Sequence, residues 1–252
     1  RAGVNAGNSI TSGGNYNVVV GDEAGTAITT GDNNTAFGKS ALATVTTAGD
    51  NTAVGNAALR ENTSGESNTA VGKSALITNT AANRNVAVGR NSLSAVNQAS
   101  ALNTYNVAMG YDSGKAVTTG FENTLIGGFA GGALTDADYN LAVGYLALAN
   151  DTLGSRSTAI GRSALAAQNF TSATDAYNTA VGFNAGTAVT TGTINTLIGG
   201  LSGDSLTTGN SNVAVGYNSL STDTLGDRNV AVGAAALSTQ NFTSTTDSYN
   251  TA

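Results

Sequence analysis

The amino-acid sequence predicts an all-β protein, a parallel β-solenoid or β-roll of about 14 coils. Three observations predict it. A 17-residue unit repeats along the chain, every unit contains a short β-type run that ends in glycine, and every unit supplies a large aliphatic residue at a second place. Because the pattern continues without a break in composition, residues 1–252 are expected to form one continuous solenoid segment of a longer fibre.

A central glycine marks each repeat. The unit reads Asn-[Thr/Val]-Ala-[Val/Ile]-Gly-x-x-[Ala/Ser]-[Leu/Gly], and its glycines recur at a 17-residue spacing, except after Gly89 and Gly161, where a 21-residue spacing follows. A weaker copy surrounds Gly3. Below, positions are counted from this glycine, which is position 0. The central glycines are Gly21, Gly38, Gly55, Gly72, Gly89, Gly110, Gly127, Gly144, Gly161, Gly182, Gly199, Gly216 and Gly233.

A 72-residue period overlies the 17-residue one, because Gly89, Gly161 and Gly233 are evenly spaced and each begins a long coil. Each block has three 17-residue coils and one 21-residue coil. The extra residues of the long coils are expected to bulge from the solenoid as loops.

The residues before each central glycine predict a short strand. Position −1 is apolar in every coil, position −3 is Thr or Val with Leu141 once, and position −2 is usually Ala, with Val19, Leu125 and Leu197 as exceptions. β-branched residues that alternate with small ones are typical of strands. A helix would carry a glycine in every repeat, at about 1 kcal/mol each.

Both faces of this strand are apolar or small, as in strands that are buried on both sides. One face can line the interior of the coil, and the other then needs a partner chain. We therefore expect a homo-oligomer of parallel chains. Position −4 is Asn in nearly every coil, with Ser157 as a break, and predicts a ladder of amide hydrogen bonds along the stack.

A second column predicts a continuous core. Position +4 is Leu in eight coils and Gly in five, and each of those five has an aliphatic residue at position +7. This exchange is expected of a packed interior, because a coil without the large group would leave a cavity. Thr-Thr-Gly and Thr-Leu-Gly sequences complete the coils as tight turns, in which Gly supplies the positive φ.

The composition argues against an enzyme. The chain has no His and no Cys, which removes the usual general base, the thiol nucleophile and the common soft metal ligands. We expect no catalytic residue, no cofactor and no metal site; Asp136 and Asp138 lack a calcium-loop pattern. Two minor alternatives are a carboxylate pair for glycoside hydrolysis, although no pair stands out from the turns, and an ice-binding threonine face, although valines interrupt that column.

Charge and hydropathy exclude two classes of partner. The net charge is −6 and the ten Lys and Arg residues are scattered singly, so nucleic acid is not an expected partner. No apolar run approaches the roughly 18 residues that a membrane-spanning helix needs, so no membrane insertion is expected in this segment.

The long coils carry the candidate surface-contact residues. Tyr105, Tyr177 and Tyr249 precede the strand that follows each long coil, and a Gln-Asn-Phe-Thr-Ser sequence lies inside two of these coils. An aromatic, polar loop could contact sugars or surfaces, or it could pack on the next coil, which is the favoured interpretation. The candidate contact residues are Asn169, Phe170, Tyr177, Asn241, Phe242 and Tyr249.

The run Asn-Thr-Ala-Val-Gly-Asn-Ala-Ala-Leu at residues 51–59, with its relatives, resembles two groups of repeats. One is found in phage and bacterial tail-fibre-type proteins that end in an endosialidase-type intramolecular chaperone. The other is the β-roll head of trimeric autotransporter adhesins, whose strands read Ser-Val-Ala-Ile-Gly. The resemblance covers nearly the whole chain, but the coil length and the Thr-Thr-Gly turns depart from the adhesin heads and leave the handedness open.

The resemblance implies a homotrimeric, extracellular fibre on a virion or a bacterial surface. We therefore expect a structural component of such a fibre, a shaft that spaces or presents an attachment function. The alternative is a trimeric adhesin head whose own surface binds host matrix or a cell-surface glycan.

Overall fold

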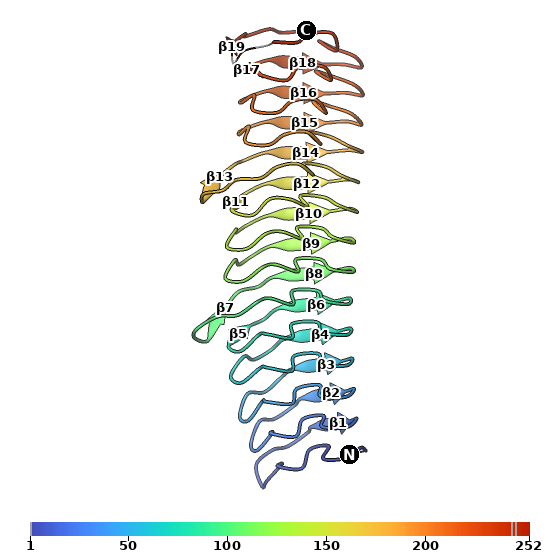
Figure 1. Ribbon diagram of the computed structural model, residues 1–252, viewed down its shortest axis with the longest axis vertical. Coiled ribbons are helices and arrows are strands. Elements are labelled where there is room, and N and C mark those ends of the chain that lie inside the picture. The colour runs from blue at the N-terminus through green and yellow to red at the C-terminus, as the bar shows by residue number, and fades with distance from the viewer. Residues whose placement is uncertain (1, 243, 245) are drawn as a thin grey trace. The chain divides into compact units, whose positions relative to one another are not determined.

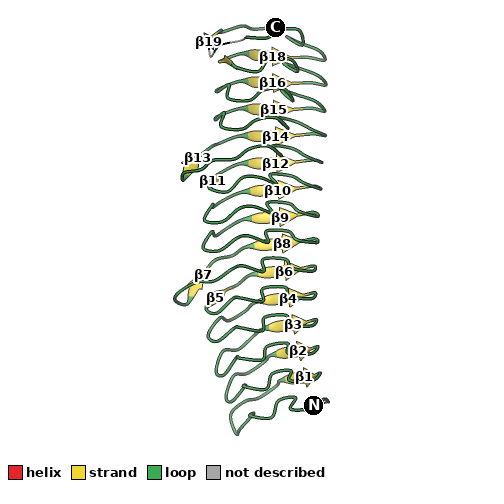
Figure 2. Ribbon diagram, viewed as in Figure 1, coloured by secondary structure: helices red, strands yellow, loops and turns green. Residues whose placement is uncertain are grey.

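Figure 1 shows the computed structural model, which describes residues 2–242, 244 and 246–252. Thr243, in the second of the two aromatic loops, lies outside the described residues. The described residues contain 19 strands and no helix, and most of each coil is turn and loop (Figure 2). They fall into two compact units, Arg1–Asn123 and Thr124–Ala252. Each unit is a parallel β-solenoid, and the chain has about 13 turns in all, which confirms the predicted architecture.

The repeated strand is three residues long and occupies positions −3 to −1 of the coil. In unit 1 these strands are β1 (Val18–Val20), β2 (Thr35–Phe37), β3 (Thr52–Val54), β4 (Thr69–Val71), β6 (Val86–Val88) and β8 (Val107–Met109). In unit 2 they are β9 (Thr124–Ile126), β10 (Leu141–Val143), β12 (Thr158–Ile160), β14 (Thr179–Val181), β15 (Thr196–Ile198), β16 (Val213–Val215) and β18 (Val230–Val232).

Neighbouring strands within a unit pair in parallel and in register with the repeat. Thr52 pairs with Thr69, one 17-residue coil later, and Val86 pairs with Val107 across a 21-residue coil. The weaker repeat at the N-terminus forms only an isolated bridge, between Ala2 and Val20. The count is therefore about 13 turns rather than the 14 expected.

Each long coil adds a second, two-residue ladder and an exposed loop. The pairs are β5 (Ala82–Asn83) with β7 (Leu102–Asn103), β11 (Gly154–Ser155) with β13 (Thr174–Asp175), and β17 (Gly226–Asp227) with β19 (Thr246–Asp247). In Figure 1, β7 and β13 stand out beyond the neighbouring coils of their own units. Residues 99–103 are exposed, so the expected bulge is confirmed there.

The core lies inside the coils. Position −2 points inward and is buried in every strand, whereas positions −3 and −1 are half-buried or exposed. The predicted aliphatic residues at +4 and +7 complete the interior, and the following are fully buried: Ile28, Leu42, Leu59, Leu76, Leu93, Val117, Leu134, Leu148, Leu165, Val189, Leu206 and Leu220. This confirms the continuous core. The alanine column at position −2 is the part of the core that the strands contribute.

The two coil types share one backbone conformation. Position +4 is left-handed whether it is leucine or glycine, with φ of 47° at Leu59 and 55° at Gly131. A Cβ at Gly131 would lie 2.6 Å from Leu125 Cδ2, because a large residue at position −2 fills the space that leucine fills elsewhere. The three exceptions in the alanine column, Val19, Leu125 and Leu197, all belong to coils with glycine at +4.

The asparagine column closes each coil and joins it to the next. Asn68 Nδ2 donates a 2.9 Å hydrogen bond to the Ala82 carbonyl of its own coil, and Asn68 Oδ1 accepts the Asn85 backbone N–H at 2.9 Å and its Nδ2 at 3.2 Å. The predicted amide ladder is therefore confirmed. At the break, Gln168 Nε2 donates to Ser157 Oγ at 3.0 Å and takes up the space left by the shorter side chain.

Candidate functional site

The exposed side of the strands forms a surface that repeats from coil to coil in each unit. We call the columns at positions −3 and −1 the outward face. Phe37 and Met109, in unit 1, remain 54% and 46% exposed, and Val232, in unit 2, remains 58% exposed. Two exposed columns border this face: the leading rim at position −5 and the trailing rim at position +1. An apolar face of this kind is characteristic of an interaction surface.

The leading rim of unit 2 carries a stacked cluster of aromatic and basic side chains. The Arg156 guanidinium carbon lies 4.7 Å from the ring centroid of Tyr139 and 5.9 Å from that of Tyr177. Arg156 Nε donates to Asp175 Oδ1 at 2.9 Å, and this hydrogen bond raises the pKa of Arg156 above its usual range. The guanidinium, which is charged as in any arginine, stacks on these rings by cation–π attraction.

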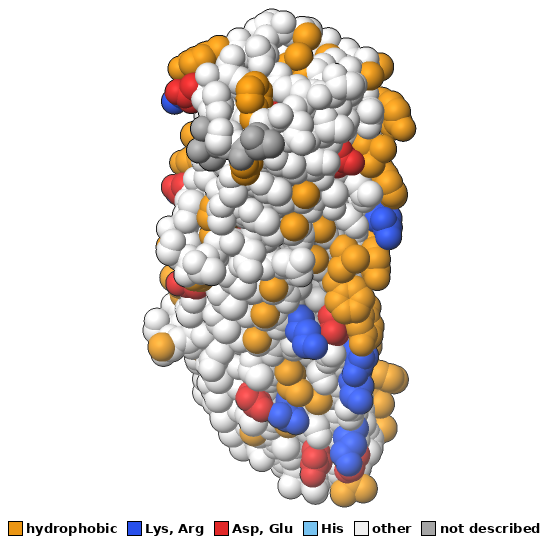
Figure 3. Space-filling model, turned by 45° about the horizontal axis from the view of Figure 1, so that its top comes forward, with side chains coloured by type: hydrophobic (Ala, Val, Ile, Leu, Met, Phe, Trp, Pro, Cys, Tyr) orange, Lys and Arg blue, Asp and Glu red, His pale blue; other side chains and the backbone are white. Residues whose placement is uncertain are grey.

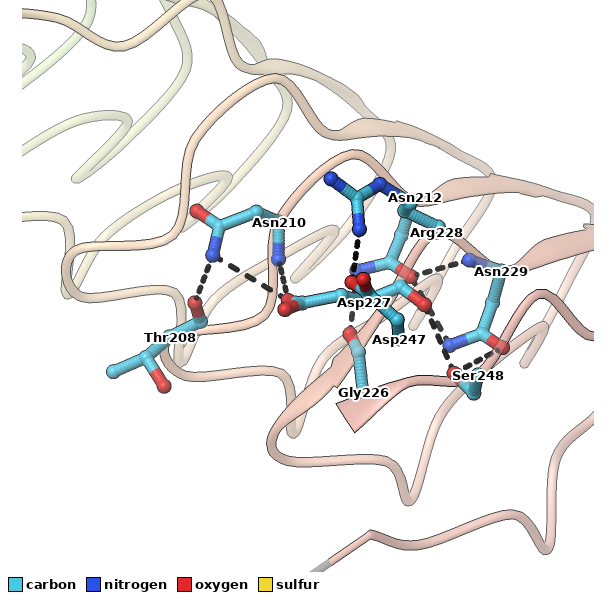
Figure 4. Close-up of polar contacts among 9 residues, drawn as sticks. All are labelled: Thr208, Asn210, Asn212, Gly226, Asp227, Arg228, Asn229, Asp247 and Ser248. Atoms are coloured by element: carbon cyan, nitrogen blue, oxygen red, sulfur yellow. Dashed lines mark hydrogen bonds and ion pairs between the residues drawn. The ribbon is translucent and has the colours of Figure 1, made fainter. Parts of the chain in front are cut away.

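The same arrangement recurs in the next 72-residue block. Arg228 is ion-paired with Asp247 (Figure 4) and lies 5.6 Å from the centroid of Tyr249. The charge of Asp247 raises the pKa of Arg228. In unit 1 the corresponding pair is Arg84 and Tyr105, joined by a 2.6 Å hydrogen bond from Nη1 to the phenol oxygen.

These rim residues adopt a backbone conformation that does not suit them. Arg156, Tyr177 and Tyr249 have φ of 63°, 49° and 48°. The left-handed region costs a residue with a Cβ about 1 kcal/mol, and Asn, Asp and Gly tolerate it best. Asn33 and Asp50 occupy the same position in other coils, so the Arg and Tyr residues are not required by the backbone.

The trailing rim is also aromatic and basic. Arg90 lies 5.3 Å from the Tyr111 centroid and its Nη1 donates to the phenol oxygen at 2.6 Å, within unit 1. In unit 2, Arg162 lies 5.5 Å from the Phe183 centroid. Figure 3 shows Lys and Arg side chains next to hydrophobic ones on the surface in this view.

The structure places the six candidate contact residues in three environments. Phe170 is 6% exposed, in agreement with the packing interpretation, and Phe242 is half-buried. The exposed Asn169 and Asn241 accept hydrogen bonds at 3.1 Å from the hydroxyls of Thr152 and Thr224. Tyr177 and Tyr249 are exposed on the leading rim, and they alone are brought together with the arginine clusters.

Two buried carboxylates, which the sequence analysis did not single out, hold the base of the long loops. Asp151 is fully buried; its Oδ1 accepts the N–H groups of Gly154 and Phe170 at 3.1 Å, and its Oδ2 accepts Gln168 Nε2 at 2.5 Å. Asp223 makes the equivalent contacts in the last block. The sequence could have predicted them, because position +7 changes from aliphatic to polar residues next to the long coils of unit 2.

A threonine column at position +8 was also overlooked. It is interrupted only by Asn in each long coil, at Asn97, Asn169 and Asn241. Thr29 Oγ1 donates to the Thr46 carbonyl at 3.1 Å, and Thr190 Oγ1 donates to the Thr207 carbonyl at 3.2 Å. Asn169 and Asn241 are therefore members of a structural ladder.

Among the described residues, no three His, Cys, Asp or Glu side chains are grouped so that they could hold a metal ion. The same residues include no helix with the length and hydropathy needed to cross a bilayer. Comparison with known proteins gave no match: no family model, no curated protein and no solved structure matches this chain.

Proposed function

We propose that this chain is a structural segment of an extracellular fibre, of a virion or a bacterial surface, and that it assembles through its outward face as a parallel homotrimer. The observation that carries the proposal is the apolar outward face, which recurs in every coil. The resemblance noted in the sequence supplies the number three and the extracellular setting.

The outward face supports association because of its composition. A sheet that has one face in water usually carries polar residues there. Here position −1 is Val, Ile, Phe or Met in every coil, and position −3 is Thr or Val, with Leu once. Burying such columns against a second copy removes apolar surface from water, at about 25 cal/mol per Å².

Charge at the two borders favours parallel chains. In unit 1 the leading rim carries two acids and one base, a net charge of −1 (Asp50, Arg84 and Glu122). The trailing rim carries one acid and three bases, a net charge of +2 (Asp22, Lys39, Lys73 and Arg90). A rotation axis along the stack brings the leading rim of one copy against the trailing rim of the next, so the net charges that meet in unit 1 are opposite, although Arg84 meets Arg90 at one level. Antiparallel packing brings like charges together.

The mass of the protein in solution tests the proposal. Light scattering coupled to size-exclusion chromatography should give three times the chain mass of 24.8 kDa. The variant Val54→Lys/Val71→Lys places charges on the outward face and should be a folded monomer. The matched control Thr47→Lys/Ser64→Lys adds the same charge at exposed turn positions and should stay trimeric. A folded wild-type monomer overturns the proposal.

The exposed tyrosines favour one alternative, an adhesin head whose own surface binds host matrix or glycan. Tyr177 and Tyr249 occupy strained, exposed positions that Asn and Asp fill elsewhere. A Tyr177→Asn/Tyr249→Asn variant should then lose adhesion to host cells while it keeps its fold. Unchanged adhesion eliminates this alternative and leaves the shaft.

A further inference from the structure

The two rims carry matching residues at the same levels of the stack. In unit 1, Arg84 and Arg90 flank β6, and Tyr105 and Tyr111 flank β8 in the next coil. In unit 2, Arg156 and Arg162 flank β12. Tyr177 and Phe183 then flank β14. The levels of Gly89 and Gly161 therefore each place an arginine pair directly before an aromatic pair, whereas at Gly233 the trailing position opposite Arg228 is Ala234.

Three of these arginines have no acidic partner among the residues that the structure describes. Arg84, Arg90 and Arg162 form no ion pair there, although the chain has a net charge of −6. Each is instead held against an aromatic ring of the next coil, at 5.3 to 5.6 Å from the centroid. The tyrosine hydroxyls of unit 1 occupy one N–H group of each guanidinium. The remaining N–H groups keep their capacity for a ligand.

We propose that a binding site for an oxyanion forms at each seam between copies, from Arg84 of one copy and Arg90 of its neighbour. A second, weaker site forms from Arg162 and Arg156, where Asp175 already pairs with Arg156. The inference rests on the parallel homo-oligomer proposed above. A rotation axis along the stack keeps equal coils at equal height. The arginine of the leading rim therefore meets the arginine of the neighbour's trailing rim, and neither chain completes the site alone.

An oxyanion is the ligand that fits this pair. Two guanidinium groups at a partly desolvated seam repel each other, and an anion between them converts the repulsion into charge-assisted hydrogen bonds. The planar fork of arginine matches phosphate, sulfate and carboxylate groups. In unit 1, the rings of Tyr105 and Tyr111 lie one coil beyond, where a sugar that carries the carboxylate can stack on them.

Thermal unfolding of the assembled protein tests the inference, with inorganic phosphate as the probe. At constant ionic strength, replacing chloride by phosphate should raise the Tm of the wild-type oligomer by ~5 °C. The variant Arg90→Gln/Arg162→Gln should lose this response, and its Tm in chloride should exceed that of the wild type because the repulsion is gone. The control Arg60→Gln alters an arginine that pairs with Glu61 outside both rims, and should respond as the wild type does.

Parallel titrations with a glucuronate oligosaccharide distinguish the source of the anion. A larger shift with the saccharide than with phosphate identifies an acidic glycan, and a shift with phosphate alone identifies a free oxyanion. An oligomer of unchanged Tm in both titrations overturns the anion site and leaves the fibre proposal standing. A wild-type monomer overturns both. A double variant that still responds to phosphate also overturns the site.

Discussion

Positions −2 and −1 are neighbours in the chain, yet they vary in different ways along the stack. The inward position is Ala in most coils and becomes Val or Leu only where position +4 is Gly. The outward position passes from Val20 to Phe37 to Val54, and Phe37 remains 54% exposed. At position −2 the size of the residue is thus restricted by the surrounding core. At position −1 the size varies and only the apolar character is constant. Protein interiors are close-packed, so a single added atom is felt there.

The largest effect is expected where two coils approach at the backbone. In Gly55→Ala the new Cβ would lie 2.6 Å from the Gly72 carbonyl oxygen, at a φ of 136° that favours glycine. Strain and overlap together should lower the free energy of unfolding by about 4 kcal/mol. Thermal unfolding followed by circular dichroism measures it. The control is Gly233→Ala, which has a similar φ of 129° and nothing within 4 Å of the added Cβ. Equal losses in the two variants would show that the close approach is unimportant.

An intermediate effect is expected from the exchange between positions −2 and +4. Leu125→Ala should cost about 3 kcal/mol because it leaves a cavity, and Gly131→Leu at least about 2 kcal/mol because its Cβ alone would lie 2.6 Å from Leu125 Cδ2. The double variant Leu125→Ala/Gly131→Leu restores the residues of the leucine type of coil at positions −2 and +4 and should recover part of the loss. Recovery is incomplete because Leu134 remains at position +7, with its Cδ1 2.8 Å from the added Cβ. A double-mutant cycle from denaturant unfolding measures the coupling. Strictly additive losses would refute the idea that the two positions share one space.

The smallest effect is expected on the outward face. Thr69 pairs with Thr52 on one side and Val86 on the other, so valine already occurs in this column. Thr69→Val should change the free energy of unfolding by no more than about 0.5 kcal/mol. The mass of the assembly in solution, measured by light scattering, should equal that of the wild type. If the free energy of unfolding in the same denaturant titration falls by more than about 1 kcal/mol, residue choice on the outward face is as restricted as at the inward position −2.

Much of the fold was predictable because the repeat places each residue above its equivalent. The strand positions, the 17- and 21-residue registers, the amide ladder and the pairing of Gly at +4 with an aliphatic residue at +7 were all read from columns. The expectation of a positive φ at the glycines of the Thr-Thr-Gly and Thr-Leu-Gly turns was wrong, because none of them lies in the left-handed region. Glycine is needed at Gly31 because the next coil passes close by: a Cβ there would overlap the Ala48 carbonyl oxygen. Which strand face lies inside was not predicted, because both faces look apolar or small. The decisive signal, that Val19, Leu125 and Leu197 occur only with Gly at +4, was present in the sequence and overlooked.

The candidate site was less predictable than the fold. The aromatic loops were predicted as candidate contact surfaces. Phe170 is nevertheless buried, because Asp151 accepts its backbone N–H and fixes the base of its loop. Tyr177 is exposed at position −5, where the backbone is left-handed. The sequence does not predict this conformation, because Tyr, Arg, Asn and Ser all occur at this position. The arginine partners of the tyrosines lie a full coil away in the sequence, and a search for local motifs does not find them.

The asparagine column has a consequence for how such a chain can evolve. Each amide joins a coil to itself and to its immediate successor, so the bonding pattern extends over nearest neighbours alone and resembles a one-dimensional lattice. Duplicating or deleting a 72-residue block then leaves the chemistry of the flanking coils unaltered. It changes the length by four strand spacings, ~19 Å. Recombination can therefore lengthen or shorten the solenoid in fixed steps, and the residues of the core need not change.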